Sequence, residues 1–316
     1  MNICKFDSIQ DELIQIFRQK SLIPIVGSGV SVGCQTAHGE VPSGTKMKSD
    51  LIEMLNNKQN FTEEEKSDFS KSKLPELCSL FEDEEIFSHE ERRAYYTRSF
   101  HLVELDDIRK KFFEINWPYV YSLNVDDAIE RNTQYKEVLV PNRKVNAEIF
   151  SNSRCLIKLH GDISDILKYS DSKKIFSTKE YAISRYTNEH LWAKLCNDFA
   201  CNNIIFCGCS LDSEIDLLAL DYFSKNNLKK NTVSRIFYAT TSTPNTTIKS
   251  ALRSYGITDV ILFENYNDIY SLIHSTWEEA EKIPTNDLNC YSDITVKKLD
   301  PNFDNDKQYL IFGKRL

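Results

Sequence analysis

The chain has 316 residues, 41% of them hydrophobic, which is enough to bury the core of one large α/β domain with a smaller inserted module. Its formal net charge of −8, from 39 Lys and Arg against 47 Asp and Glu, leaves no broad cationic surface and argues against nucleic acid as a primary partner. No apolar run approaches the roughly 20 residues that span a bilayer, and the N-terminus lacks a basic stretch followed by an apolar one, so we expect neither a membrane segment nor export.

The first predicted elements are a helix and a buried strand. Apolar residues recur at helical spacing near the N-terminus, at Ile9, Leu13, Ile16 and Phe17. The run LIPIVG at residues 22–27 then has the length and composition of a buried strand. A loop rich in Gly and Ser follows to about Gly44, and the stretch 47–55 is helix-like. Glycines directly after a strand indicate that the backbone approaches something closely.

The middle of the chain predicts helices first and strands afterwards. Residues 61–114 are charged and helix-like without a convincing strand, so we expect an inserted helical subdomain at about 56–115. Short β-rich runs then return at regular intervals, at residues 118–123, 155–160, 203–208, 235–240 and 259–263.

Strands that alternate with helices in this way predict an α/β fold. We expect a Rossmann-like, mostly parallel sheet with helices on both faces, and such sheets bind ligands at the carboxyl ends of their strands. This domain would span residues 1–282. Residues 283–316 carry turn signals at Pro284 and Pro301 and would form a C-terminal extension or the start of a further domain.

The glycine-rich turn after the first buried strand is the first candidate binding site. Gly27, Ser28 and Gly29 would let backbone N–H groups reach a pyrophosphate, and Ser31 adds a hydroxyl donor. The alternative is a tight turn with a purely structural role, because Gly-x-Gly also occurs in such turns. The full Gly-x-Gly-x-x-Gly pattern is not met, since the next glycine is Gly33.

The second and third candidates also follow predicted strands. Asn124 and Asp126 lie directly beyond the strand at 118–123, where the sheet would present them to the ligand crevice. For the neighbouring Asp127 we prefer a structural role as helix N-cap. His160 ends the strand at 155–160 and is placed to act as a general base, the alternative being a half-buried histidine satisfied by backbone groups.

The fourth candidate is the turn after the strand at 203–208. Gly208 and Ser210 offer a second nucleotide contact there. The alternative is ordinary strand-to-helix turn chemistry, with Asp212 or Ser213 as the helix N-cap.

These four segments, in this order and spacing, resemble the sirtuin superfamily, specifically the sirtuin-like NAD hydrolases of bacterial anti-phage defence systems. The resemblance covers roughly residues 22–279. The family's Gly-Ala-Gly-x-Ser element is matched by Gly27, Ser28, Gly29 and Ser31, and its Asn-x-Asp element by Asn124 and Asp126. Its Lys-x-His-Gly element is matched by Lys158, His160 and Gly161, and its Gly-x-Ser-Leu-x-Asp element by Gly208, Ser210 and Leu211. Ser28 replaces the family's alanine, and the last element fits only if its aspartate is taken as Asp212.

Cysteine usage separates the chain from the sirtuin deacylases, which hold a structural zinc between two Cys-x-x-Cys pairs. The chain has nine cysteines and no such pair, and the Pro-x-Phe-Arg that follows the glycine loop in deacylases is missing too. We therefore expect no metal site, no zinc and no acyl-lysine substrate. Cys207 and Cys209 are interpreted as packed thiols. An odd number of cysteines fits a reducing compartment, so we expect a cytoplasmic protein.

The resemblance implies that NAD is the substrate and that the nicotinamide–ribose bond is cleaved. Asn124 would orient water or the ribose, Asp126 would hold the nicotinamide carboxamide, and His160 would act as base. Ser31 and Ser210 would hold phosphate or ribose oxygens. The alternatives are a module that binds NAD or ADP-ribose without cleaving it, an ADP-ribosyl transferase and, least favoured, a deacylase.

Regulation is also implied, because uncontrolled loss of NAD would kill the cell that makes the protein. We therefore expect a homo-oligomer or a defence-system partner protein. The helical insertion and the segment beyond residue 283 are the surfaces we expect to take part.

Overall fold

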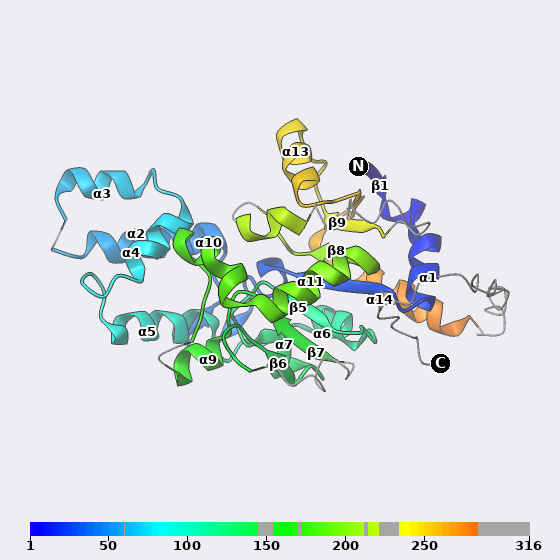
Figure 1. Ribbon diagram of the computed structural model, residues 1–316, viewed down its shortest axis with the longest axis horizontal. Coiled ribbons are helices and arrows are strands. Elements are labelled where there is room, and N and C mark those ends of the chain that lie inside the picture. The colour runs from blue at the N-terminus through cyan, green and yellow to red at the C-terminus, as the bar shows by residue number, and fades with distance from the viewer. Residues whose placement is uncertain (60, 145–153, 170–171, 212–213, 221–233, 284–316) are drawn as a thin grey trace, which may run out of the picture. The chain divides into compact units, whose positions relative to one another are not determined.

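The computed structural model describes residues 1–59, 61–144, 154–169, 172–211, 214–220 and 234–283 (Figure 1). The chain divides into two units, Met1–Glu281 and Lys282–Leu316. Nearly all of the second unit, including the turn signals at Pro284 and Pro301, lies outside the described residues, so the predicted C-terminal extension stays a prediction.

The first unit is built on an eight-stranded sheet whose spatial order is β1-β10-β9-β8-β2-β5-β7-β6. Each strand runs parallel to its neighbours, which confirms the predicted α/β fold with a parallel sheet. The strands in chain order are β1 (Asn2–Lys5), β2 (Leu22–Val26), β5 (Val120–Ser122), β6 (Glu137–Leu139), β7 (Cys155–Lys158), β8 (Asn203–Cys207), β9 (Ile236–Thr240) and β10 (Asp259–Leu262).

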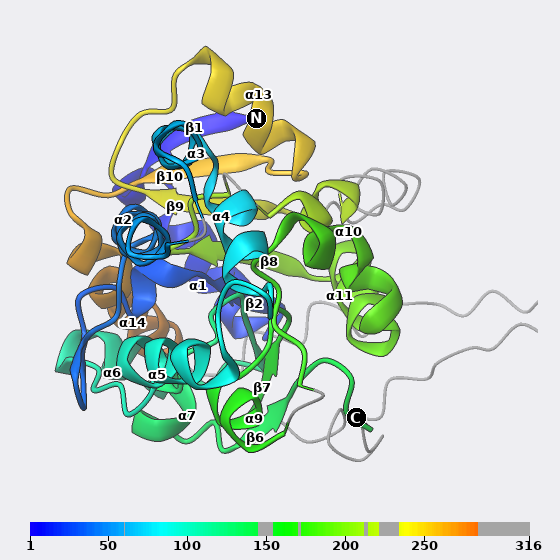
Figure 2. The same ribbon diagram turned by 90° about the vertical axis from the view of Figure 1, so that its left-hand side faces the viewer.

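Helices lie on both sides of this sheet, as Figure 2 shows with α11 to the right of the strands and α6 and α14 to the left. The helices of the described residues are α1 (Gln10–Arg18), α2 (Gly44–Asn56), α3 (Glu63–Phe69), α4 (Leu74–Phe81), α5 (His89–Phe100), α6 (Asp107–Glu114), α7 (Ala128–Asn132), α9 (Ile163–Lys168), α10 (Thr178–Thr187), α11 (Glu189–Cys201), α13 (Thr246–Ser254) and α14 (Tyr266–Lys282), with short 3₁₀ helices η1 (Phe6–Ser8), η2 (Ser28–Val30) and η3 (Ile215–Ala219).

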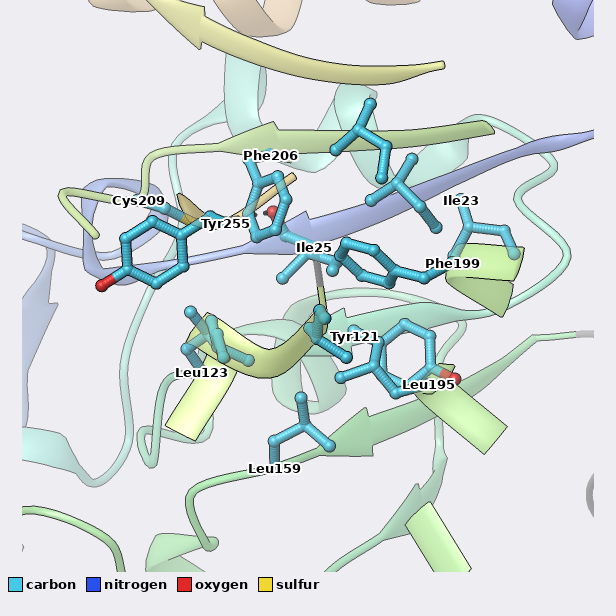
Figure 3. Close-up of a cluster of buried hydrophobic side chains, with 14 of the residues drawn as sticks. Ile23, Ile25, Tyr121, Leu123, Leu159, Leu195, Phe199, Phe206, Cys209 and Tyr255 are labelled. Carbon is cyan, nitrogen blue, oxygen red and sulfur yellow. Dashed lines mark hydrogen bonds between the residues drawn. The ribbon is translucent and has the colours of Figure 1, made fainter. Parts of the chain in front are cut away.

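The core on one side of the sheet is continuous (Figure 3). Buried strand residues such as Ile25, Tyr121 and Phe206 share one hydrophobic cluster with Leu195 and Phe199 of α11. All five residues of β2 are buried, because a central parallel strand is covered on both faces. The run LIPIV has the continuous apolar character that this position requires.

Aromatic packing joins α1, α6 and α14. The ring of Phe112 on α6 lies 5.2 Å from that of Trp117 and 5.5 Å from that of Tyr270 on α14. Phe17 of α1 contacts the same tryptophan at 5.4 Å. These contacts fix α6 and α14 against each other, which matters for the site below.

The predicted helical insertion contains α3, α4, α5 and α6, and its described residues contribute no strand to the main sheet. Capping boxes start α3 and α5, with Thr62 paired to Glu65 and Ser88 paired to Glu91.

Two details differ from the predictions. The loop before Gly44 contains a small antiparallel hairpin of β3 (Gln35–Thr36) and β4 (Gly39–Glu40), and α2 begins at Gly44 because Ser43 caps it.

Candidate active site

The glycine turn after β2 packs directly on the turn after β8. The Gly29 N–H donates to the Gly208 carbonyl oxygen at 2.8 Å. A Cβ on Gly27 would lie 2.7 Å from that same oxygen, and a Cβ on Gly29 would lie 2.8 Å from the Gly208 Cα. Gly208 itself has φ +66°, in the left-handed region that favours glycine. The glycines are therefore required for the contact between the two turns, whether or not a ligand is present.

A cavity of about 490 Å³ opens beside these two turns, within the size range of small-molecule sites. Ser28, Gly29, Gly208 and Ser210 all line it, so four of the six residues predicted to bind the cofactor share one space. It lies at the carboxyl ends of β2, β8 and β9, the edge at which parallel sheets bind ligands. Gly27 lies behind it in the contact between the turns.

Ser31, Asn124 and Asp126 form one buried hydrogen-bonded cluster. The Ser31 hydroxyl donates to Asp126 Oδ2 at 2.6 Å, and Asn124 Nδ2 donates to Ser31 Oγ at 3.1 Å and to the Gly27 carbonyl at 3.0 Å. Two segments about a hundred residues apart in the chain are thus joined by contacts that the sequence analysis did not predict. The Ser31 hydroxyl is occupied by these two side chains, so its predicted contact with a phosphate stays a prediction.

Burial controls the protonation of Asp126. The side chain is buried, and this burial raises the pKa of its carboxyl even though Lys158 and the Ser31 hydroxyl act in the opposite direction. The N–H of Ala128 also donates to Asp126 Oδ1 at 3.1 Å. The carboxyl is therefore held in one orientation by two donors.

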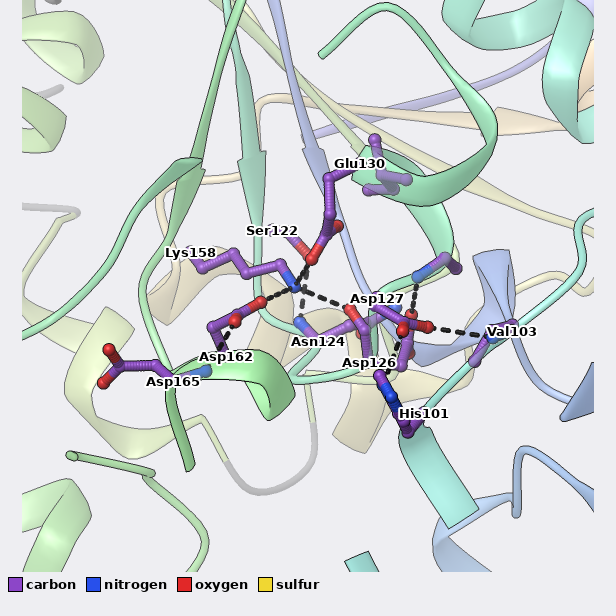
Figure 4. A network of polar contacts seen from close by, with 12 residues as sticks. His101, Val103, Ser122, Asn124, Asp126, Asp127, Glu130, Lys158, Asp162 and Asp165 are labelled. Atoms are coloured by element: carbon purple, nitrogen blue, oxygen red, sulfur yellow. Dashed lines mark hydrogen bonds and ion pairs between the residues drawn. The ribbon is translucent and has the colours of Figure 1, made fainter. Parts of the chain in front are cut away.

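Lys158 ties the strand that carries His160 to the loop that carries Asp126 (Figure 4). Its Nζ donates to the Asp126 carbonyl oxygen at 2.7 Å and forms ion pairs with Glu130 and Asp162. Burial alone would favour the neutral amine, but the two carboxylates outweigh it and raise the pKa of Lys158. Burial also raises the pKa of Glu130 to about 8, against the effect of Lys158. Lys158 is thus a charged cross-link inside the fold.

His160 lies at the same level of the sheet as Asn124. Ser122 of β5 is paired with Lys158 of β7. Asn124 lies two positions after Ser122, and His160 lies two positions after Lys158. Neighbouring strands are about 4.8 Å apart. The structure therefore brings His160 and Asn124 to adjacent positions beyond the carboxyl ends of β7 and β5.

A carboxylate that the sequence analysis did not identify pairs with His160. Asp216 Oδ2 lies 3.2 Å from His160 Nε2 and also accepts from the Ser184 hydroxyl at 3.1 Å. The edge of the His160 ring meets Tyr181 at 5.4 Å between centroids. Burial works against protonation of the imidazole, but Asp216 outweighs it, so the pKa of His160 is raised. Its backbone contact with Leu123 acts in the same direction.

The structural interpretations of the remaining residues have mixed outcomes. Asp127 occupies the N-cap position of α7 but makes no capping bond, so the predicted cap is wrong in its detail. Its carboxylate instead accepts from the N–H groups of Leu102 and Val103, each at 2.8 Å, and anchors the segment between α5 and α6. Cys207 and Cys209 are buried, which confirms that they are packed thiols. Asp212 and Ser213 lie outside the described residues.

A parallel α/β sheet with a cavity beside two glycine turns at the carboxyl ends of its strands defines a Rossmann-like class of fold. Residues 118–260 match the model of the SIR2-like domain family, a span that contains Asn124, Asp126, His160 and Gly208. The chain therefore carries a sirtuin-like domain over this span. The search of curated proteins found no match to the chain.

Two further observations concern metals and membranes. Within the described ranges, no three His, Cys, Asp or Glu side chains gather as a metal site would require. Among the helices described, none is both long and apolar enough to cross a bilayer.

Proposed function

We propose that the chain hydrolyses the nicotinamide–ribose bond of NAD to give nicotinamide and ADP-ribose, as a regulated NAD-depleting effector of anti-phage defence in the cytoplasm. The observation that carries the proposal is the buried cluster of Ser31, Asn124 and Asp126, level in the sheet with His160. None of these residues lines the cavity, but Asn124 donates to the carbonyl of Gly27, which directly precedes the cavity-lining Ser28 and Gly29. A site that only bound NAD would not need a buried amide, carboxyl and imidazole together at the nicotinamide end.

The chemistry requires positioning more than acid catalysis. Nicotinamide leaves from a pyridinium as a neutral base and keeps the electron pair of the broken C–N bond, so no proton donor is needed. Positive charge builds on the ribose, and a water oxygen forms the new bond at the same carbon. The water's proton passes to His160, while Asn124 orients the water or the ribose and Asp126 holds the carboxamide.

The cavity supplies a place for the adenosine half of NAD. Ile248 and Tyr266 line it with 46% and 61% of their surfaces exposed, which is unusual for large apolar side chains near a sheet edge. A base stacked against them would cover this surface. Ser28 and Ser210 of the two turns line the same cavity, where ribose or phosphate oxygens would meet their hydroxyls.

A binding module that does not cleave NAD is the second candidate, and one observation favours it. His160 is only 3% exposed, with Asp216 and Tyr181 packed against its ring. Under the hydrolase proposal this closure is the regulated state, and an activating homo-oligomer or partner protein displaces these two residues from the imidazole. An ADP-ribosyl transferase would share each step up to the acceptor.

The test is to incubate the purified chain with NAD and to identify the products by mass, with an Asn124→Ala variant as the blank. The proposal expects nicotinamide and ADP-ribose in equal amounts, made by the wild type alone or after its activator is added. ADP-ribose found attached to protein or nucleic acid instead would favour the transferase. Tight binding of NAD without cleavage under every activating condition would favour the binding module.

We also propose that this chemistry needs no zinc, because the chain has no Cys-x-x-Cys pair. Elemental analysis of the purified protein should find no stoichiometric zinc, and acetyl-lysine peptides should stay intact. About one zinc per chain, the content of a structural site, would contradict this.

A further inference from the structure

The cavity beside the glycine turns is lined by a charged residue that lies outside the span of the family match. Among the described residues that line it, Arg109 is the one that carries a charge, in a chain whose formal net charge is −8. Arg109 belongs to α6 in the helical insertion and lies outside the matched span 118–260. An arginine among otherwise uncharged lining residues offers N–H donors to an anionic ligand.

The guanidinium of Arg109 has an N–H donor without an acceptor among the described residues. Its Nη1 pairs with Asp106, whereas its Nε is buried and has no hydrogen-bond partner among the described residues. A buried N–H without an acceptor is costly, so a site of this kind is incomplete until an acceptor enters. The side chain is still 16% exposed, which leaves it open to a ligand in the cavity.

A second unpaired polar group lies close by. The Tyr270 hydroxyl is buried without a partner in the described part of the chain, and it would lie 3.0 Å from a Cβ placed on Gly208. The Tyr270 ring also lies under the Arg109 guanidinium at 5.7 Å, within cation–π range. Because α6 and α14 pack through Phe112, the guanidinium is held beside the turn that contains Gly208.

We propose that Arg109 binds the pyrophosphate of NAD, so that a helix outside the matched domain completes the nucleotide site. This rests on the proposed function, since it assigns a further residue to the same substrate. The pyrophosphate is favoured over other anions because Arg109 shares the cavity with Ser28, Gly29 and Gly208 of the two turns, and its planar fork of donors matches phosphate oxygens.

A kinetic signature follows from the reaction. NAD and ADP-ribose carry the same pyrophosphate, which takes no part in the bond that breaks. Arg109 would therefore stabilise substrate, transition state and product about equally. Its loss should raise KM and leave kcat nearly unchanged, the reverse of what is expected for His160.

The experiment measures ADP-ribose and adenosine binding by calorimetry on the full chain, with Arg109→Gln, Arg109→Lys and Lys111→Gln. Lys111 is exposed on the same helix, so its variant loses the same charge without touching the cavity. Arg109→Gln should weaken ADP-ribose binding by roughly tenfold to a hundredfold, the scale of hydrogen bonds to a charged group, while Lys111→Gln stays within about twofold. Arg109→Lys should lose less, and adenosine should bind the variants and the wild type alike.

Thermal melting separates misfolding from loss of contact, and Arg109→Lys keeps the test open if the Gln variant is unstable. ADP-ribose binding equal to wild type in a folded Arg109→Gln protein overturns this inference and leaves the proposed function standing. Equal losses in Arg109→Gln and Lys111→Gln also overturn it, because the effect would then be general electrostatics. A wild type that binds neither NAD nor ADP-ribose overturns the proposed function as well.

Discussion

The two halves of the candidate site are in different states. The adenosine half is an open cavity of about 490 Å³ with exposed Tyr266 at its rim. The half that holds His160 and Asp126 is filled by protein, with those side chains 3% and 4% exposed. The open half rests on backbone contacts between two glycine turns, which need no ligand, whereas the closed half is covered by side chains of α10 and η3.

This difference explains how the chain could hold NAD without consuming it. The residues that would bind the dinucleotide already line the cavity. The imidazole of His160, which would act as base, is instead paired with Asp216 of η3. An activator would then have to change only the contacts of Asp216 and Tyr181. The population of the state in which His160 is free of Asp216 would then set the rate.

The largest effect is expected in the closed half. Replacing His160 or Asn124 by Ala should cut turnover by roughly a hundredfold or more, the usual scale for a positioned base or dipole, while much of the NAD affinity remains. Turnover and ADP-ribose affinity measured on the same preparations test this. If His160→Ala instead melts the protein and leaves turnover per folded molecule unchanged, the histidine is structural.

The contact between the two glycine turns should be sensitive to added volume. Gly27→Ala places a Cβ 2.7 Å from the Gly208 carbonyl oxygen, so we expect it to destabilise the fold by about 1–3 kcal/mol. Gly39→Ala is the matched control, since nothing lies within 4 Å of its added Cβ. Denaturant unfolding should find the control within about 0.5 kcal/mol of wild type. Equal losses of stability in both variants would contradict close packing of the two glycine turns.

The pH dependence should report the His160–Asp216 pair. Because Asp216 raises the pKa of His160 in the closed state, Asp216→Asn should lower that pKa, which an NMR titration of the imidazole in the NAD-free protein would measure. The sign for stability follows from linkage. The pair stabilises the fold fully below the unfolded pKa of about 6.5, and this is lost as pH rises through the higher folded pKa. Asp216→Asn should remove that pH dependence, and an unchanged profile would argue against the pair.

The smallest effect is expected for Ser31. Its hydroxyl joins Asn124 and Asp126, so Ser31→Ala should loosen both and lower turnover by several-fold, near the net value of one or two hydrogen bonds. Steady-state kinetics separate this from a phosphate contact. A rise in KM with constant kcat would instead assign Ser31 to the phosphates.

The sequence predicted the central strands and missed the two edge strands for a physical reason. β2 and β8 are covered on both faces and carry continuous apolar runs, which single-sequence patterns detect. β1 and β6 form the two edges of the sheet, are partly exposed and lack such runs, so nothing local distinguishes them from loops.

The site was predictable where residues follow strands and unpredictable where they arrive by packing. Asn124 and His160 each lie two residues beyond the end of a strand, so the register of the sheet sets their level. Asp216 and Arg109 reach the site from η3 and α6, whose positions depend on tertiary contacts that no local pattern encodes. Such residues become visible only in three dimensions.

The most direct test of the account is the structure of the Asn124→Ala protein with NAD bound. We predict the adenosine between Ile248 and Tyr266, the pyrophosphate beside Gly29 and Gly208, and the nicotinamide directed at Asp126 with Asp216 moved away from His160. NAD bound outside the cavity, or seated in it with the nicotinamide in solvent and the His160–Asp216 pair intact, would contradict the proposed division of the site.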